Sequence, residues 1–403
     1  MPCFLLAQER WSSWQKRQWW LRARQRSGLE EEASTSRTTL EEEHAEALGI
    51  EKFLEEQAPL IDKAIEKYIP RKFTKNAVLF KVNPPRHSCN VETLNKAIAE
   101  PIWEFLDRGG KRWRPALFLL ICEALGKKAE DHLDFAIIPE VVHNGTLIID
   151  DIEDSSELRR GKPCTYKLYG IDIAVNAGNT MYYLPLLPLM EKRVAIQPEK
   201  LRDLYEVYVQ EMINLSMGQA MDIAWHRGIA NADNLSEEDY LQMCAYKTGT
   251  LARMAAKLAA VLAGASRELV EKLGCYAESI GVAFQMQDDV LDLTGKEFAQ
   301  KKGGFGQDVT EGKRTLIVIH TLKKANAADK KRLISILNMH TSEQALRDEA
   351  ISIMQKYNAI EHVKLTATQI VEKSWKEAEK LLKASEAKEK LKAFAEFLIK
   401  RQM

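Results

Sequence analysis

The amino-acid sequence predicts an all-α fold, a single-domain helical bundle. From about residue 48 onward, apolar residues recur with helical period, so that they fall on one face of each helix. The clearest example is the run Leu251, Met254, Ala255, Leu258, Val261 and Leu262. No proline, the residue that breaks long helices, follows Pro198. No segment shows the alternation of apolar and polar residues that is typical of strands. These observations predict helices throughout and no sheet.

The composition is that of an ordinary globular protein. The chain has 403 residues, of which 45% are hydrophobic, and this is enough for one large core. The 58 basic and 58 acidic residues cancel, so no overall positive field attracts nucleic acid or an anionic membrane. The six cysteines form no CxxC pair, as expected in a reducing compartment. We therefore expect no nucleic-acid partner, and any polyanion must be bound locally.

Residues 1–47 differ from the rest, and we treat them as an extension to an all-helical domain of residues 48–403. The first 28 residues contain six arginines and lysines but only one acid, Glu9. This bias is typical of an organelle transit peptide, whereas the acidic stretch of residues 30–43 is not, and a disordered leader is the alternative. No apolar run reaches the roughly 18 to 20 residues of a transmembrane helix. We expect a cytoplasmic protein with no transmembrane segment, and organelle targeting by residues 1–28 stays open.

Two short acidic segments echo each other along the chain. They are Asp150-Asp151-Ile152-Glu153-Asp154 and Asp288-Asp289-Val290-Leu291-Asp292. On a helix, the first and fifth residues of each segment lie on the same face, so each segment forms a carboxylate cluster about one turn long. Clustered carboxylates repel each other unless a divalent cation lies between them, and magnesium prefers a few carboxylates together with phosphate oxygens.

The residues before each acidic segment are apolar. Phe135, Ile138, Val142 and Ile149 lead to the first segment, and Val282, Ala283, Phe284 and Met286 to the second. A single segment of this kind is usually a solvated helix end. Two of them, each at the end of an apolar helix, instead predict carboxylates at the mouth of a deep apolar cavity. Such a site would hold an apolar molecule by its metal-bound anionic head.

Basic residues complete the predicted anion site. Arg159 and Arg160 follow the first acidic segment, and the segment GGKRWRP begins at residue 109. Arginine is suited to phosphate oxygens, although each pair alone is more often a surface cation. Lys247-Thr248 and Lys313 add further positive groups. Carboxylates that need metals and cations that bind a diphosphate directly together imply two anionic substrates. His143 lies two turns before the first acidic segment. It is either a residue of the apolar core or a contact to a ligand.

With these segments, the sequence resembles the trans-type polyprenyl diphosphate synthases, and most of all the geranylgeranyl diphosphate synthases. The resemblance extends from about residue 48 to residue 380. Its most specific parts, in the order and spacing of the family, are GGKRWRP, DDIEDSSELRRGKP, KTGTL, FQMQDDVLD and DVTEGKRT. The resemblance implies the isoprenoid-synthase helical bundle, and it implies isopentenyl diphosphate and an allylic diphosphate as substrates.

The resemblance also implies a role for each matching residue. Asp150, Asp151 and Asp154 match the first aspartate-rich motif and Asp288, Asp289 and Asp292 the second, which together hold three magnesium ions around the allylic diphosphate. The residues implied to bind isopentenyl diphosphate are Lys111, Arg114, His143 and Arg160. The residues implied to contact the allylic diphosphate are Arg159, Lys247, Thr248, Gln285 and Lys313. The catalytic candidates are Asp150, Asp154, Asp288 and Lys247.

The family reaction needs no side-chain base. The allylic diphosphate ionises, isopentenyl diphosphate attacks the carbocation, and a proton is lost to the released diphosphate, giving an all-trans chain that is five carbons longer. Family members are commonly homodimers. The sequence departs from the family at Gly303, where many members have a lysine, and the nearest lysine here is Lys302.

Two other readings compete with this one. A terpene cyclase shares the first aspartate motif but usually replaces the second with an Asn/Ser/Glu triad, whereas this chain has DDVLD at residues 288–292. A non-catalytic partner subunit typically lacks some of the aspartates, and this chain has all six.

Chain length is expected to depend on residues below the first aspartate motif. Gly145 and Thr146, five and four positions before Asp150, are small, and Val142 lies one turn further. No large ring therefore blocks the growing chain at this level, which favours a twenty-carbon product over farnesyl diphosphate. Longer products stay open, because Tyr182 and Tyr183 on a later helix either form the floor of the cavity or face elsewhere. The alternative for Gly145 is that it only permits close helix packing.

Overall fold

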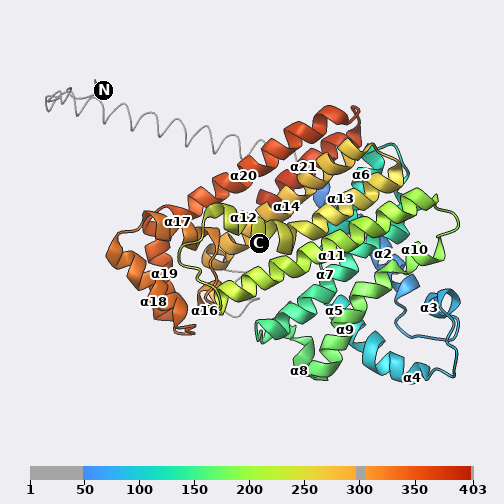
Figure 1. The fold of residues 1–403 in the computed structure, drawn as a ribbon, viewed down its shortest axis with the longest axis horizontal. Coiled ribbons are helices and arrows are strands. Elements are labelled where there is room, and N and C mark those ends of the chain that lie inside the picture. Colours follow the sequence, from blue (N-terminus) through green and yellow to red (C-terminus); the bar gives the residue numbers. More distant parts are fainter. Residues whose placement is uncertain (1–48, 296–304, 401–403) are drawn as a thin grey trace.

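The computed structural model describes residues 49–295 and 305–400 (Figure 1). The N-terminal extension of residues 1–47 and the Lys302–Gly303 position lie outside these ranges, so the predictions for them stay predictions. In the described ranges the elements are helices apart from one hairpin of two-residue strands, β1 (Leu158–Arg159) and β2 (Lys162–Pro163). The all-α prediction is confirmed. The hairpin was missed because two residues are too few to show alternation.

The centre of the molecule is α13 (Thr250–Ala263), which packs against helices on several sides. Its neighbours are α6 (Trp113–Ala124), α7 (Leu133–Glu153), α11 (Pro198–His226) and α14 (Arg267–Thr294). The sequence of α13 explains its position, since alanine and leucine occupy most of the helix and ten of its residues are buried. A helix that is apolar on most sides belongs in a core. In Figure 1, α20 (Ala359–Ala378), α14, α13 and α11 lie side by side along the long axis.

A second apolar cluster packs the N-terminal helices against the outer face of α7. Ile61, Ile65 and Tyr68 from α2 meet Ile137 and Val141 there. The elements of this region are α2 (Ile50–Tyr68), α3 (Val78–Val82), α4 (Val91–Leu94), η1 (Asn95–Ala99), α5 (Glu100–Leu106), η2 (Ala129–His132), α8 (Thr165–Tyr169), α9 (Ile171–Tyr183), η3 (Leu184–Leu186) and α10 (Leu187–Glu191). Helix α7 therefore lies between two cores, and this fixes the position of the acidic segment at its end.

The C-terminal part covers the side of α14. Helices α20 and α21 (Glu386–Lys400) run along it, and shorter helices close one end of the bundle (Figure 1). The remaining elements are α12 (Glu237–Cys244), η4 (Ala245–Gly249), α16 (Gln307–Thr310), α17 (Leu316–Lys324), α18 (Ala327–Asn338), α19 (Gln344–Lys356) and η5 (Glu379–Leu381). Among the residues that the structure describes, no helix has both the length and the apolar run required to span a bilayer.

Candidate active site

The first aspartate cluster lies at the C-terminal end of α7. Asp151 is fully buried, and Arg159 donates to its Oδ1 from Nε at 2.7 Å and from Nη2 at 2.5 Å. The hairpin places this arginine, because Arg160 and Gly161 both have positive φ (53° and 76°), as a tight two-residue turn with right-handed strand twist requires. Burial alone would lower the pKa of Arg159, but the carboxylates of Asp151 and Asp150 outweigh it and raise the pKa above its usual range. Arg159 thus orients Asp151.

Lys247 joins this cluster to α11. Its Nζ lies 2.5 Å from Oδ2 of Asp222 and 3.3 Å from Oδ1 of Asp150. Gln219, one turn before Asp222, donates to the same Asp150 oxygen at 2.9 Å. The lysine lies in η4, a π-helical turn, and such turns are frequent at functional sites. Only a glycine fits opposite it, because a Cβ on Gly218 would overlap the backbone nitrogen of Lys247.

The second aspartate cluster is built by α14 and its neighbours. Asp289 accepts hydrogen bonds from the Tyr240 hydroxyl at 2.7 Å and from Nε2 of Gln285 at 2.9 Å. The Thr248 hydroxyl donates to Oε1 of Gln285 at 3.0 Å, so Thr248 acts on Asp289 through that amide. The backbone nitrogen of Asp308 donates to Oδ2 of buried Asp292 at 3.1 Å. Both motifs are therefore held by fixed donors.

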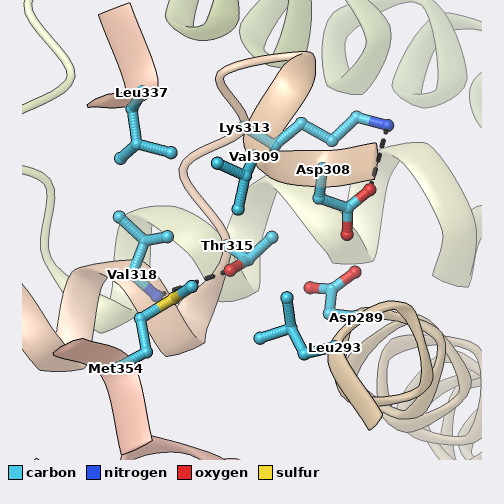
Figure 2. Close-up of a pocket in the computed structure, with 9 residues that line it drawn as sticks. All are labelled: Asp289, Leu293, Asp308, Val309, Lys313, Thr315, Val318, Leu337 and Met354. Atoms are coloured by element: carbon cyan, nitrogen blue, oxygen red, sulfur yellow. Dashed lines mark hydrogen bonds and ion pairs between the residues drawn. The ribbon is translucent and has the colours of Figure 1, made fainter. Parts of the chain in front are cut away.

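Lys313 lies between the two clusters. Its Nζ is 3.8 Å from Oδ2 of Asp154 and 3.7 Å from Oδ1 of Asp308, and it also pairs with Glu311. Figure 2 shows the carboxylates of Asp289 and Asp308 facing the same pocket, with Lys313 reaching over Asp308. The apolar side of this pocket consists of Leu293, Val309, Val318, Leu337 and Met354. Lys313 thus connects Asp154 of the first acidic segment to Asp308, whose backbone nitrogen binds Asp292 of the second segment.

The carboxyl groups of the site differ in pKa. Burial and the neighbouring Asp150 raise the pKa of Asp154 to about 7, and burial together with Asp308 raises that of Asp289 to about 8. Burial also disfavours the charged form of Asp150, but Lys247, Arg159 and Lys313 together outweigh it and hold the pKa of Asp150 well below its usual range. The clusters therefore contain more carboxyl groups than their lysines and arginines neutralise, and a divalent cation would supply the missing charge.

A strongly cationic region lies on the other side of the first motif. Arg160 donates to the carbonyl oxygen of Gly109 and, at 3.3 Å, to Oδ1 of Asn144. Burial, opposed only in part by Glu140, lowers the pKa of Arg160 to about 10. Burial and the nearby Arg114 and Arg160 hold the pKa of His143 well below its usual range. Such a concentration of positive charge is suited to binding an anion.

The residues of the GGKRWRP segment have different roles. Arg112 is bound by Asp62 at 2.8 Å and Glu140 at 3.1 Å, so it is a structural residue. Arg114 is buried with its guanidinium 4.4 Å from the Trp113 ring centre. Lys111 is exposed, 5.4 Å from the ring centre of Phe397. The structure thus brings Arg114, His143 and Arg160 together, while Lys111 lies at the exposed edge.

The chain-length candidates occupy unequal positions on α7. A Cβ on Gly145 would lie 2.8 Å from the carbonyl oxygen of Gly178 and from Cβ of Met181. Close packing of α7 against α9 therefore accounts for this glycine. Val142 is fully buried in the core. Thr146 is half-buried, and its hydroxyl donates to the carbonyl oxygen of His143 at 2.7 Å. Thr146 is thus the least buried of the three residues.

Sequence reasoning missed four residues of the site, Gln219, Asp222, Tyr240 and Asp308. Gln219 and Asp222 lie one turn apart on a long helix, and this spacing is a weak indication that they act together. Asp308 begins the DVTEGKRT segment, which is a weak indication of the same kind. Tyr240 had none, because only the packing of α12 against α14 brings its hydroxyl to Asp289.

The sequence matches one family model over residues 95–354, that of polyprenyl synthetases. This chain belongs to the polyprenyl synthetase family. Members of the family elongate prenyl chains and are metal-dependent, so the chain is a prenyltransferase.

Named relatives agree with the family match. A geranylgeranyl diphosphate synthase from Methanosarcina mazei is 38% identical over 224 residues, which are 56% of this prenyltransferase and 67% of the relative. A short chain isoprenyl diphosphate synthase from Methanothermobacter thermautotrophicus is 35% identical over 229 residues, 57% and 68% of the two chains.

Solved structures agree on the fold. A geranylgeranyl pyrophosphate synthetase from Pyrococcus horikoshii superposes with a TM-score of 0.74 at 29% identity, over 88% of this prenyltransferase and 98% of that chain. A polyprenyl synthase from Caulobacter crescentus, solved with calcium and isoprenyl diphosphate, has a TM-score of 0.72 at 21% identity, over 88% and 98%. At that identity the second likeness shows the fold alone.

Proposed function

We propose that this prenyltransferase joins isopentenyl diphosphate to an allylic diphosphate and releases the twenty-carbon geranylgeranyl diphosphate. The observation that carries the proposal is the position of Lys313, with Nζ 3.8 Å from Asp154 and 3.7 Å from Asp308. Asp154 of the first acidic segment and Asp308, whose backbone binds Asp292 of the second, therefore border one small volume. A metal-bound diphosphate requires this arrangement, because its oxygens share the cations with several carboxylates.

The six motif aspartates are the proposed magnesium ligands, with three ions per site as in the family. Their donor set fits magnesium, which prefers carboxylate oxygens. Two carboxyls with raised pKa values, Asp154 and Asp289, would release protons and gain a cation partner on binding. Bound magnesium would stabilise the negative charge of a departing diphosphate. Asp151 and Asp292 are already oriented by Arg159 and by the Asp308 backbone.

The lysines have a second role once carboxylate charge is neutralised. Lys247 and Lys313 then become available to diphosphate oxygens, because each is held now only by carboxylates of the site. Both are the proposed contacts to the allylic diphosphate. Their ammonium groups would stabilise the leaving diphosphate where its charge develops, which is the largest contribution that a preorganised site makes.

Isopentenyl diphosphate is assigned to the cationic region of Arg114, Arg160 and His143, with Lys111 at its exposed edge. Among the described residues, the Arg160 guanidinium donates to a backbone carbonyl and to an amide oxygen, so no hydrogen-bonded carboxylate neutralises its charge. His143 has a lowered pKa and is neutral at neutral pH. It therefore donates one hydrogen bond to an anion without adding to the positive charge.

The twenty-carbon product rests on Thr146 and on the names of the relatives. A larger side chain at Thr146 is expected to shorten the product, so Thr146→Phe should shift it to fifteen carbons or fewer. The matched control is Thr146→Val, which keeps the volume and should leave the product unchanged. A Gly145→Phe variant is not a suitable test, because its ring would meet the backbone of α9 and overpacking of this kind destabilises the fold.

The function is tested with purified protein, isopentenyl diphosphate and allylic diphosphates of increasing length, with and without magnesium. We expect magnesium-dependent chain extension that stops at twenty carbons on chromatography. Release of a cyclic hydrocarbon from the allylic diphosphate alone would indicate a cyclase. Absence of any turnover with magnesium would indicate a non-catalytic subunit, and either result would refute the proposal.

The exposed face of α11 supports a homodimer. Val209, Ile213 and Met217 recur every fourth residue and are 54%, 49% and 53% exposed. An apolar stripe at this spacing on a long helix is suited to packing against a second copy of the same helix. Ile213→Lys should convert the dimer to a monomer in light scattering, whereas a wild-type protein that is monomeric at micromolar concentration would contradict the assignment.

A further inference from the structure

A cluster of metal-ligating side chains lies where α12, α17 and α20 converge. It consists of Glu237, the first residue of α12, His320 in the middle of α17 and His362 in the first turn of α20. Each residue contributes one ligand atom, and these atoms all lie within 4.8 Å of one another. None of the six motif aspartates is part of the cluster. The three residues come from widely separated parts of the sequence, so only the tertiary fold brings them together.

The two histidines direct nitrogens at different oxygens of one carboxylate. Nδ1 of His320 is 3.6 Å from Oε1 of Glu237, and Nε2 of His362 is 3.1 Å from Oε2. The imidazole rings stack with centroids 3.9 Å apart at an interplanar angle of 25°. Zinc binds imidazole and carboxylate at about 2.0 to 2.1 Å, so adjacent ligand atoms of a tetrahedral site lie about 3.3 Å apart. The two observed nitrogen–oxygen separations, 3.1 and 3.6 Å, lie on either side of this value.

The second indication of a metal site is that His320 is buried with an unpartnered ring nitrogen. The residue is only 9% exposed, and its Nδ1 is buried without a hydrogen-bond partner. A distance of 3.6 Å to the nearest carboxylate oxygen is too long for a hydrogen bond. Buried polar atoms normally have partners. A metal ion between the ring and the carboxylate would supply the partner that the protein does not.

We propose that Glu237, His320 and His362 form a binding site for a transition-metal ion of the zinc class, separate from the magnesium centre. Imidazole nitrogens favour zinc, copper or nickel, whereas magnesium favours oxygen ligands alone. Two histidines and one glutamate leave the fourth tetrahedral position to water. The side chains of His362 and Glu237 are 30% and 27% exposed, so an ion has a path to the site from solvent.

Nearby charges determine how strongly the site binds. Lys323 faces Glu237 and Lys324 faces His320, and both oppose a cation electrostatically. The carboxylate of Glu237 acts in the opposite sense. The competing arrangement is a simple side-chain pair, in which Nε2 of His362 donates to Glu237 and no metal is needed. The two arrangements are distinguished by measuring zinc binding. Only the metal site binds zinc in a way that depends on Glu237 and the histidines.

A metal at this position would tie three helices together. Because an ion that binds only the folded state stabilises it by mass action, zinc should raise the midpoint of thermal unfolding. The effect should be independent of substrates, since the ligands belong to no part of the diphosphate site. This independence allows the site to be measured on the complete enzyme with the acidic motifs saturated by magnesium.

The experiment is a zinc titration of the full chain by calorimetry in excess magnesium, so that the aspartate motifs are already occupied. The test variants are His362→Gln and Glu237→Gln, whose partly exposed side chains can be changed without opening the core. The matched control is His87→Gln, which removes an exposed histidine elsewhere. Cobalt(II) serves as a spectroscopic probe, because a tetrahedral cobalt site with imidazole ligands absorbs visible light.

We expect one zinc equivalent in the wild type and in His87→Gln, with a rise in unfolding midpoint and a cobalt absorption band. Both test variants should bind zinc at least about 100-fold more weakly and lose the thermal shift, because each lacks a direct ligand. Equal zinc affinity and equal thermal shift in all four proteins would overturn the proposal. So would the absence of zinc binding by the wild type, which would leave only the side-chain pair.

Discussion

Removing the Lys247 ammonium should destabilise the metal-free protein strongly. Its Nζ lies 2.5 Å from Asp222 and 3.3 Å from Asp150, and at an effective dielectric constant of about 20 these pairs attract by about 7 and about 5 kcal/mol. Desolvation offsets most of this attraction, so the net loss in Lys247→Met should be about 3–5 kcal/mol, as for other broken buried pairs. Magnesium with inorganic diphosphate should restore part of the lost stability, because cations then neutralise the same carboxylates.

The matched control is Lys257→Met on the next helix. Lys257 pairs at 2.6 Å with Glu271, whose side chain is 64% exposed, and an exposed pair contributes at most about 1 kcal/mol. Urea unfolding in chelator and again in magnesium gives both free energies of unfolding, and steady-state kinetics should show about a 100-fold loss in use of the allylic substrate for Lys247→Met only. Equal stability losses and equal kinetics in the two variants would refute the pairing on which the proposed site depends.

Three further predictions concern the rest of the site. Asp150→Ala and Asp288→Ala should each lower turnover by at least about two orders of magnitude while the protein stays folded by circular dichroism, and near-normal rates at saturating magnesium would contradict the metal assignment. Arg114→Ala should raise mainly the Michaelis constant for isopentenyl diphosphate, and an equal rise for the allylic substrate would contradict the assignment of Arg114 to the isopentenyl diphosphate site. Asp154 and Asp289 have pKa values of about 7 and about 8, above those of ordinary carboxyls, so the folded state holds protons that the unfolded state releases. Metal-free stability should therefore fall as pH rises from about 4 to about 8, and magnesium affinity should rise over the upper part of that range. Urea unfolding in chelator and magnesium titrations at several pH values check both signs, and a flat profile would be inconsistent with them.

Local sequence was sufficient for the fold class and for much of the site. The apolar period of α13 depends only on residues within one helix, and burial of such a helix follows from the hydrophobic effect. The two acidic segments were visible for the same reason, because residues four apart share a helix face whatever the rest of the chain does. The family resemblance then assigned roles to residues such as Lys313 that spacing alone leaves unassigned.

Contacts between distant segments were decided by the tertiary structure alone. Gly145 looked like an open place in a tunnel wall, but its neighbours on α9 show that it permits close helix packing. Tyr240 and Asp308 reach Asp289 only through the packing of other elements against α14. The same holds for Glu237, His320 and His362, whose meeting point no periodicity could indicate. Periodicity reports which face of a helix is buried, whereas the partner of that face depends on the path of the whole chain.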